Sequence, residues 1–221
     1  MIIGVSGRIG SGKDTVGEII QKLCLTNNGP KFEIKKYAGK LKQIASLLTG
    51  IPVEDFEDQE FKKSYLGAEW GTVKSNPLNA VPVFADVSFN ELMSVRELLQ
   101  KLGTEAIRDG LHPNAWVNAL MCEYKRPKMS EYNPSNWIIT DMRFPNEMEA
   151  VVERKGLTIR VVRPHGYTNP HTGEYKEMPL SYHTSETALD DAKFNYTIFN
   201  DGSIEDLIEK VRQILITEKI I

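Results

Sequence analysis

The first fifteen residues constrain the fold more than any other stretch of the chain. Residues 2–5 are apolar, residues 7–15 read GRIGSGKDT, and residues 16–23 place apolar side chains at helical spacing. A strand, a glycine-rich turn and a helix in this order let backbone N–H groups and the positive end of the helix dipole converge on phosphate oxygens. The pattern therefore predicts a site for the phosphates of a nucleotide.

The lysine and the residues after it suggest how such phosphates would be held. Lys13 is long enough to reach the β- and γ-phosphates of a bound nucleotide. The residue after the lysine is usually Ser or Thr, but here it is Asp14, and the hydroxyl comes one position later at Thr15. Magnesium coordination could run through Thr15, through water or through Asp14, and Asp14 suits a structural role at the helix dipole equally well. The predicted donor-binding set is Gly10, Ser11, Gly12, Lys13, Asp14 and Thr15.

Composition and charge narrow the class of protein. A chain of 221 residues with 41% hydrophobic content can bury one substantial core with an inserted subdomain. A net charge of −3 does not suggest a nucleic-acid-coating protein, and no apolar run approaches the ~20 residues that span a membrane. Two cysteines without a CxxC motif favour a reducing cytoplasm. We therefore expect small-molecule partners, no nucleic-acid polymer and no membrane.

Strand and helix patterns alternate along the chain, as in a parallel sheet wrapped by helices. Ser203 should cap the last helix, with Asp206 as its capping-box partner. Two segments, 50–93 and 164–190, are polar and turn-rich and look like insertions over the open end of the sheet, where long loops usually bind or cover a ligand. The predicted strands are 2–6, 33–37, 137–140, 158–162 and 196–199, and the predicted helices are 13–24, 40–48, 94–109, 114–124, 146–155 and 203–218.

A second chemical motif follows an apolar strand at residues 137–140, which leads into Asp-x-Arg. Ligands of open α/β sheets bind outside the carboxyl ends of the strands, so Asp141 and Arg143 should face the same crevice as the glycine-rich loop. Asp141 could hold hydrated magnesium or a substrate hydroxyl, and Arg143 could neutralise a transferring phosphoryl group. The alternative is that Asp141 and Arg143 simply pair with each other.

Two further sets of basic and amide side chains are candidates for phosphate or base recognition. Arg96 and Gln100 share one helix face, which suits a phosphate and a base edge, although spacing alone slightly favours a solvated polar face. Arg163 ends its strand at the edge of the sheet where ligands bind, which makes it a phosphate candidate.

Five segments, in order and over nearly the whole chain, resemble the bacteriophage deoxynucleoside monophosphate kinases. They are GKDT at 12–15, YAGKLK at 37–42, VR followed by QxLGT at 95–104, DxR at 141–143 and NDGS at 200–203. The resemblance implies an α/β, three-layer P-loop NTPase fold with a central parallel five-stranded sheet, in which residues 1–221 form one kinase domain with an acceptor-side insertion at 50–93 and a lid at 164–190. It implies that ATP, with Mg²⁺, phosphorylates a deoxynucleoside monophosphate in the host cytoplasm.

The resemblance also assigns roles to residues. It implies that Gly10, Gly12, Lys13 and Thr15 hold the donor phosphates and that Arg143 with basic residues of the lid clamps the transferring group. We therefore expect Lys13, Asp141 and Arg143 to be catalytic, with Thr15 and Asp141 as the metal ligands. The Asn200–Ser203 turn, with Asp201 and Gly202, would lie beside the donor adenine. Related monophosphate kinases also carry the hydroxyl residue two positions after the lysine, as Thr15 does here. The acceptor-binding residues that the resemblance implies are Arg96, Gln100, Arg108 and Trp116. The predicted substrate-binding set also includes Lys42 and Arg163.

Two other functions remain open. Dephospho-coenzyme A and phosphomevalonate kinases resemble the chain in the P-loop and the Asp-x-Arg motif, although residues 100–104 argue against them. A P-loop protein can also be a nucleotide switch that hydrolyses ATP or GTP without an acceptor, but no guanine-reading NKxD motif is present. The sequence does not fix the acceptor base or the oligomeric state, for which a homodimer is one option.

Overall fold

The computed structural model describes residues 1–71, 92–124, 135–164, 166–168, 175–177 and 184–221. These residues form two compact units, one made of Met1–Tyr37 with Val117–Ile221 and the other of Ala38–Trp116. The described part of the predicted 50–93 insertion belongs to the second unit, and residues 72–91 lie outside the described residues. Of the predicted 164–190 lid, residues 165, 169–174 and 178–183 also lie outside them. No helix among the described residues is long and apolar enough to cross a membrane.

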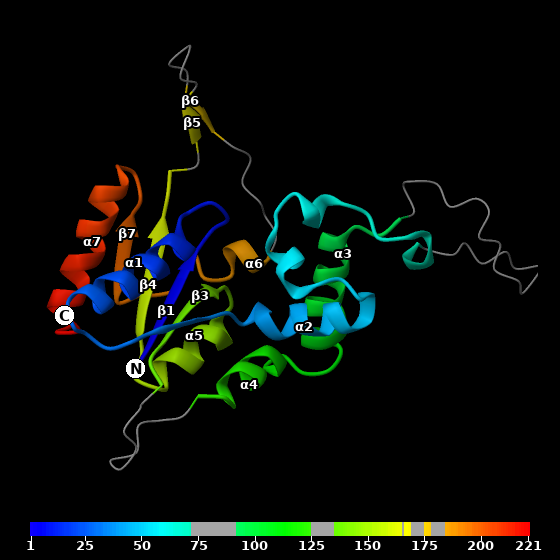
Figure 1. The fold of residues 1–221 in the computed structure, drawn as a ribbon, viewed down its shortest axis with the longest axis horizontal. Coiled ribbons are helices and arrows are strands. Elements are labelled where there is room, and N and C mark those ends of the chain that lie inside the picture. The colour runs from blue at the N-terminus through cyan, green and yellow to red at the C-terminus, as the bar shows by residue number, and fades with distance from the viewer. Residues whose placement is uncertain (72–91, 125–134, 165, 169–174, 178–183) are drawn as a thin grey trace, which may run out of the picture. The chain divides into compact units, whose positions relative to one another are not determined.

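The first unit is built on a five-stranded sheet. Its strands are β1 (Ile2–Gly7), β2 (Glu33–Lys35), β3 (Trp137–Met142), β4 (Leu157–Val162) and β7 (Tyr196–Phe199). They lie in the order β2-β3-β1-β4-β7, and all four pairings are parallel, which confirms the predicted sheet (Figure 1). Because β1 lies between β3 and β4, the loop that follows Gly7 emerges beside the carboxyl ends of both neighbours, where ligands of such sheets bind.

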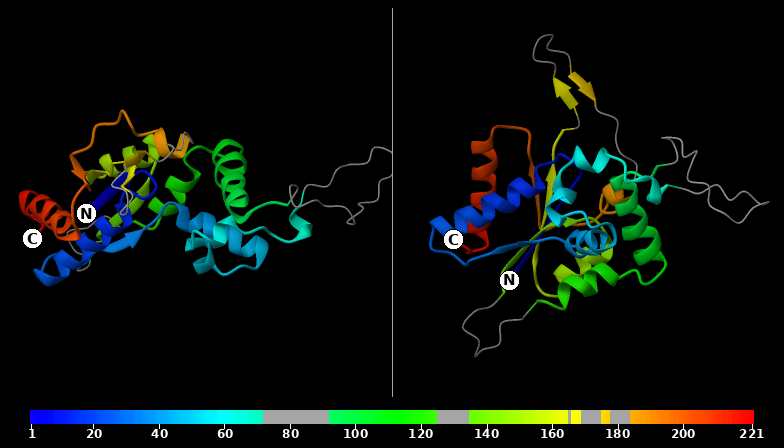
Figure 2. Two further views of the ribbon diagram at one scale, coloured as in Figure 1. Left: turned by 90° about the horizontal axis from the view of Figure 1, so that it is seen from above. Right: turned by 45° about the vertical axis from the view of Figure 1, so that its right-hand side comes forward.

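Helices cover both faces of this sheet, because the central strands are apolar on both sides. Ile3 and Val5 pack in one core cluster with α1 (Lys13–Thr26) and α7 (Ile204–Thr217). Ile2 faces the other way, into a cluster with residues of α4 (Ala115–Met121) and α5 (Pro145–Val152). The unit is therefore a three-layer α/β structure, which Figure 2 shows from two further sides.

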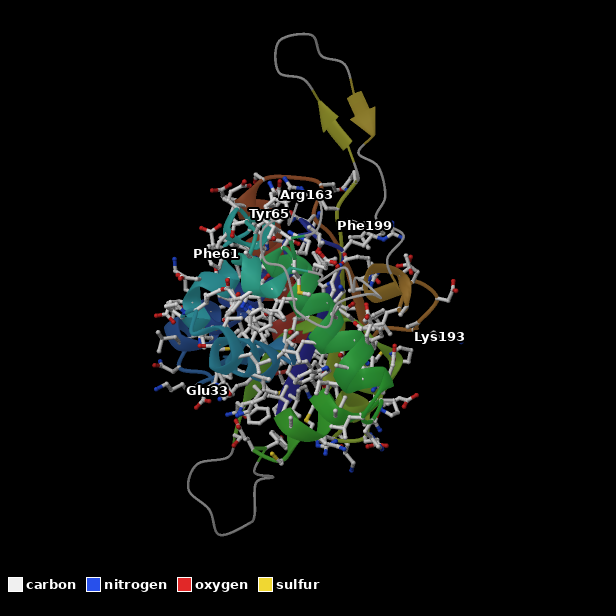
Figure 3. The ribbon with its side chains drawn as sticks, turned by 90° about the vertical axis from the view of Figure 1, so that its right-hand side faces the viewer. Glu33, Phe61, Tyr65, Arg163, Lys193 and Phe199 are labelled. Atoms are coloured by element: carbon white, nitrogen blue, oxygen red, sulfur yellow. The ribbon has the colours of Figure 1, made fainter. Side chains whose placement is uncertain are left out.

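The second unit has a smaller core of its own. It contains α2 (Ala38–Thr49), three short 3₁₀ helices η1 (Val53–Glu57), η2 (Phe61–Lys63) and η3 (Ala68–Trp70), then α3 (Val95–Gln100) and η6 (Lys101–Asp109). Phe61 packs edge-on against Phe56, while Tyr65 is exposed; Figure 3 labels Phe61 and Tyr65. The buried residues of its hydrophobic cluster are Ala45, Phe56, Leu66, Val95 and Leu98.

Several predicted bounds differ from the structure by up to three residues, and two differences bear on the predicted site residues. The predicted helix 94–109 is an α-helix only to Gln100, and continues as the π-helix η6. Apolar spacing cannot separate the two, since the wider turn keeps Leu98 and Leu102 toward the same core. Strand β3 continues to Met142, so Asp141 lies within the strand rather than after its end. Ser203 does cap α7, and its reciprocal bonds with Asp206 confirm the predicted capping box.

The predicted lid contains three described elements. Strands β5 (Gly166–Thr168) and β6 (Tyr175–Glu177) form an antiparallel pair, and the short helix α6 (Thr184–Thr187) follows. A lid function for this segment stays a prediction.

Candidate active site

The glycine-rich loop has the backbone of a phosphate cradle. It joins the end of β1 at Gly7 to the start of α1 at Lys13, with left-handed φ values of 76° at Gly10 and 93° at Gly12. A Cβ added at Gly10 would meet nothing within 4 Å. Ser11 is buried, and its Oγ has no hydrogen-bond partner among the described residues. An unsatisfied oxygen and an open glycine at a helix N-terminus fit an incoming phosphate group.

Asn200, just after β7, holds this loop in place. Its Nδ2 donates a hydrogen bond to the carbonyl oxygen of Ser11 at 2.8 Å. A Cβ added at Gly12 would lie 2.5 Å from the same nitrogen. The sequence predicted the turn at 200–203 but gave no indication of this contact, because it joins segments that are 189 residues apart.

Substituting Gly12 is expected to cost more stability than substituting Gly10. Both residues have positive φ, and holding alanine there costs about 1–3 kcal/mol of folding free energy. Only at Gly12 does the new methyl group also displace Asn200. We expect Gly12→Ala to lower the free energy of unfolding in urea by more than Gly10→Ala does. Equal losses would show that the Asn200 contact does not constrain the loop.

Lys13 is a buried cation. It is 8% exposed, and its pKa is lowered first by burial and then by the charge of Arg143. Asp14, Glu186 and Asp141 act in the opposite direction but do not reverse the shift. A positive charge that water solvates poorly gains strongly from an anionic ligand, which suits the predicted contact with phosphates.

Asp14 is tied to the next strand and to a lysine. Its Oδ1 accepts a hydrogen bond from Thr140 Oγ1 at 2.8 Å, and Lys36 Nζ lies 3.5 Å from the same oxygen. Burial alone would raise the pKa of Asp14, but the Thr140 hydrogen bond and the charges of Lys36 and Lys13 outweigh it and hold the pKa below its usual 3.8. These contacts give Asp14 a structural role, whereas a metal role for Asp14 or for the half-buried Thr15 stays a proposal.

The lowered pKa of Asp14 predicts a contribution to stability that disappears in acid. A carboxylate with a depressed folded-state pKa stabilises the fold above its unfolded pKa, and this contribution is lost as the pH falls through the folded value. We therefore expect wild type to melt above Asp14→Asn at pH 7, with the gap in Tm shrinking below about pH 4. Thermal unfolding of both proteins from pH 7 to pH 2.5 measures it, and a gap independent of pH would contradict the assignment.

Asp141 and Arg143, the other two residues predicted to be catalytic, are both anchored by hydrogen bonds. Asp141 Oδ1 accepts a hydrogen bond from the backbone N–H of Tyr37 at 2.8 Å. The backbone N–H of Arg143 donates to the buried Glu147 carboxylate at 2.7 Å, and the Arg143 guanidinium forms an ion pair with Glu186. The charges of Arg143 and Asp141 both act on Lys13, so the three residues predicted to be catalytic share one electrostatic environment.

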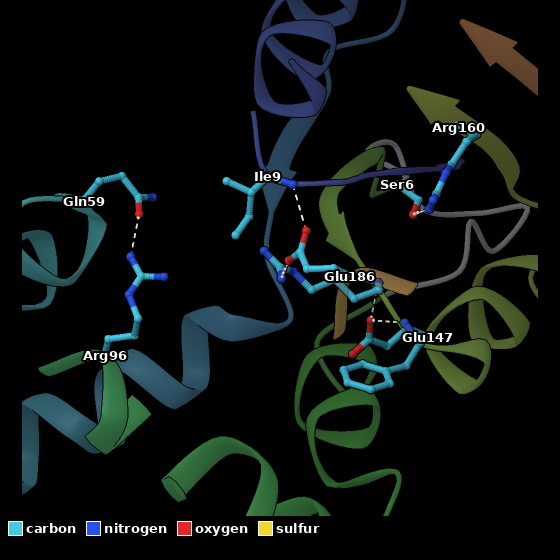
Figure 4. Close-up of polar contacts among 9 residues, drawn as sticks. Ser6, Ile9, Gln59, Arg96, Glu147, Arg160 and Glu186 are labelled. Atoms are coloured by element: carbon cyan, nitrogen blue, oxygen red, sulfur yellow. Dashed lines mark hydrogen bonds and ion pairs between the residues drawn. The ribbon is translucent and has the colours of Figure 1, made fainter. Parts of the chain in front are cut away.

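Glu186 is a member of this site that we did not predict. Its Oε2 accepts a hydrogen bond from the backbone N–H of Ile9, inside the glycine-rich loop, at 2.8 Å (Figure 4). Its side chain is only 4% exposed. Glu186 lies in a polar, turn-rich segment, so nothing in the local pattern marked it as buried. Glu147 was not predicted either, because a glutamate in the first turn of a helix is usually solvated, whereas Glu147 in α5 is buried.

Arg160 on β4 and Arg163 just after it differ in their surroundings. Arg160 donates to Ser6 Oγ at 3.0 Å and forms an ion pair with Asp190 at 2.5 Å, which also binds Arg8 of the loop. Arg163, the predicted phosphate contact, is exposed just beyond the strand (Figure 3) and makes no ion pair with the described residues. Its role stays a prediction.

Two of the predicted acceptor-binding residues of the second unit bind side chains of the segment between α2 and η2. Lys42 is buried and forms an ion pair with Glu57. Arg96 on α3 donates to Gln59 Oε1 at 3.3 Å (Figure 4), and Gln100 at the end of the same helix is exposed. The i, i+4 relation between Arg96 and Gln100 is therefore kept.

Arg108 lies on the π-helix η6, and Trp116, at the start of α4, contacts η6 through its indole. Arg108 is half-buried on η6. Trp116 is 6% exposed, and its Nε1–H donates to the Gly103 carbonyl oxygen at 2.8 Å. Its indole thus supports the π-helix, which is a structural role that the sequence did not suggest, and a role in substrate binding stays a prediction.

Asp201 and Gly202 form the exposed turn before α7. Lys210 Nζ lies 2.8 Å from Asp201 Oδ1, and this hydrogen bond lowers the pKa of Asp201. The turn adjoins Asn200 and so is linked to the glycine-rich loop, but its predicted position beside a donor base stays a prediction.

The described residues contain no group of three or more His, Cys, Asp or Glu side chains placed to hold a metal ion. Mg²⁺ seldom needs such a cage, because it keeps several waters and is usually held by one or two protein oxygens together with substrate phosphates. Thr15 and Asp141 each carry an oxygen of the kind that this mode of binding uses, and their role as magnesium ligands stays a prediction.

Comparisons with known proteins agree on one family. A family model described as deoxynucleotide monophosphate kinase matches residues 56–211. The chain is 25% identical over 225 residues to the deoxynucleoside-5'-monophosphate kinase of Escherichia phage T5, covering 86% of this chain and 85% of that protein. It is 26% identical over 255 residues to the deoxynucleotide monophosphate kinase of Enterobacteria phage T4, covering 97% and 98%. Among solved structures, shikimate kinase from Aquifex aeolicus vf5 aligns over 99% of this chain and 98% of that one, at 11% identity and a TM-score of 0.40, which is too low to support a conclusion.

Proposed function

The chain belongs to the deoxynucleotide monophosphate kinase family, and we propose that it transfers the γ-phosphate of ATP to a deoxynucleoside 5'-monophosphate. One observation carries the proposal: the buried Lys13 begins the helix after the glycine-rich loop, and Glu186 binds both the Ile9 N–H of that loop and the Arg143 guanidinium. The glycine-rich loop lies outside the matched residues 56–211, so its geometry supports a phosphate donor independently of the family match.

Positioning and charge neutralisation would supply most of the rate, because phosphoryl transfer passes through a loose transition state with little covalent chemistry for the protein to perform. The backbone N–H groups of the loop and Lys13 would bind donor phosphates. Arg143 would neutralise charge on the transferring group, and Asp141 with Thr15 would hold magnesium, which when bound supplies further neutralisation of phosphate oxygens.

Acceptor recognition is assigned to the second unit and to the residue after β4. Arg96 and Gln100 share α3 and present a guanidinium and an amide, which can pair with a phosphate and with a base edge. Lys42, Arg108, Trp116 and Arg163 complete the proposed acceptor set, and Asp201 with Gly202 would lie beside the donor base. Segment 164–190 would act as a lid that excludes water during transfer.

Release of ADP in a coupled assay tests the proposal directly. The protein is supplied with ATP and Mg²⁺ and with each of a panel of deoxynucleoside and ribonucleoside monophosphates, dephospho-coenzyme A and phosphomevalonate, and Lys13→Met serves as the negative control. Fast release with one or a few deoxynucleotides supports the proposed function and names the acceptor. Slow release that is indifferent to the acceptor favours a nucleotide switch, and fast release with dephospho-coenzyme A or phosphomevalonate moves the protein to a different acceptor.

A further inference from the structure

The Glu186 carboxylate connects two parts of the site that the sheet alone does not join. Its Oε2 accepts a hydrogen bond from the Ile9 N–H of the loop that follows β1 (Figure 4). Its Oε1 forms an ion pair with Arg143, which follows β3. The segment that carries it, α6, is far from both in sequence, since Glu186 lies 177 residues from Ile9 and 43 from Arg143.

Burial makes this arrangement costly unless it is well satisfied. A carboxylate that is 4% exposed has lost most of its hydration, and such a charge is stable only with a paired cation and further hydrogen-bond donors. Arg143 supplies the cation and Ile9 the N–H. Removing Arg143 or the Ile9 N–H would leave the buried Glu186 carboxylate less well compensated. We therefore expect the three groups to hold one another in a single geometry.

The charges around Glu186 show what that geometry achieves. Lys13 and Arg143 repel each other, and this repulsion contributes to the lowered pKa of Lys13, while Glu186 partly offsets it. A carboxylate placed among these groups allows two cations to lie near one phosphate-binding loop in the absence of phosphate. Neutralising Glu186 is therefore expected to let Arg143 move away from Lys13.

We propose that Glu186 is a positioning residue that fixes the Arg143 guanidinium against the phosphate-binding loop so that it meets the transferring phosphoryl group. This role rests on the proposed kinase function. Asp190, in the turn after α6, forms ion pairs with Arg8 and Arg160 and thereby holds the same loop through a different pair of cations.

A double-mutant cycle in the ADP-release assay tests the proposal. Glu186→Gln keeps the size of the side chain and removes its charge. We expect it to lower kcat ~10- to 100-fold with less than about a twofold change in the KM for either nucleotide, because a displaced Arg143 is missed most in the transition state. In an Arg143→Met background the same substitution is expected to cost nothing further, because Glu186 acts through Arg143. Unchanged kcat in the single variant, or full additivity in the double variant, would overturn the proposal.

Two further measurements separate this role from folding and from the proposed function. Glu209→Gln is the matched control, since Glu209 pairs with Arg212 on the exposed face of α7, and it should leave kcat unchanged. If Glu186→Gln does not fold, Glu186→Asp, which keeps the charge but withdraws it by one methylene, is taken through the same cycle with the same expected non-additivity.

The amide resonance of Ile9 in ¹⁵N-labelled protein should shift in either variant without any nucleotide present, and an unmoved resonance would overturn the contact. Wild-type protein without acceptor-dependent ADP release would remove the proposed function and this role with it, while a shifted Ile9 resonance would still show the contact.

Discussion

Replacing Lys13 with methionine is expected to lower kcat/KM by at least ~10²- to 10³-fold while leaving the protein as stable as wild type or more so. The loss of rate follows because a preorganised charge aimed at the transferring group contributes about this much in other enzymes. The gain in stability follows because Lys13 is buried and its pKa is lowered chiefly by desolvation, so the folded protein carries a charge that it solvates poorly. Methionine fills a similar volume without that charge.

The measurement combines the ADP-release assay with thermal unfolding of the two proteins. Lys22→Met is the matched control, because Lys22 lies on the same helix α1 with its side chain exposed, and it should change neither quantity appreciably. A Lys13→Met protein that keeps its rate would exclude Lys13 from phosphate binding. A protein that loses both rate and stability would show instead that the lysine charge is needed to fold the loop.

The central sheet could be predicted from the sequence because its strands are marked locally. The apolar runs at 2–6, 137–140 and 158–162 are bounded by turns and alternate with helical patterns, and such alternation leaves a parallel sheet as the simplest arrangement. The capping box of α7 was readable for the same reason, since Ser203 and Asp206 are only three residues apart.

Contacts between distant segments could not be predicted in this way. Asn200 on Ser11, Glu186 on Ile9 and Thr140 on Asp14 each join residues more than 100 positions apart, and no local spacing records them. The sequence identified the groups that bear the chemistry, such as Lys13, but not the side chains that hold these groups in place. The contacts of these supporting side chains depend on which strands and loops are neighbours in the folded protein.

The π-helix shows a different limit. Residues 94–109 have an apolar pattern that an α-helix and a wider helix satisfy equally, so periodicity predicted one continuous α-helix. The departure begins after Gln100, and the indole of Trp116 binds the Gly103 carbonyl within it. The Trp116 indole lies thirteen residues from Gly103 in the sequence, so this contact is again one that local periodicity does not record.

Arg143 should prove as sensitive as Lys13, and more sensitive to shape than to charge. Lysine at this position keeps the positive charge but replaces a planar fork of donors with a single point charge. We expect Arg143→Lys to lower kcat ~10²-fold, and Arg143→Met to lower it ~10³-fold or more, since an arginine that neutralises the transferring phosphoryl group contributes on this scale. The KM for ATP should change much less than kcat in both variants, because the interaction strengthens as charge develops in the transition state.

Steady-state kinetics against ATP and the preferred monophosphate separate these two parameters. Arg154→Lys is the matched control, because Arg154 lies after α5, where its guanidinium binds the Ala150 carbonyl oxygen at 2.9 Å rather than the loop. If Arg143→Lys retains the wild-type kcat, charge alone suffices, and the fixed orientation imposed by Glu186 has no catalytic consequence. If instead Arg143→Lys and Arg143→Met are equally impaired, then the guanidinium geometry is what the site requires, and the ion pair with Glu186 is the contact in the structure that sets it.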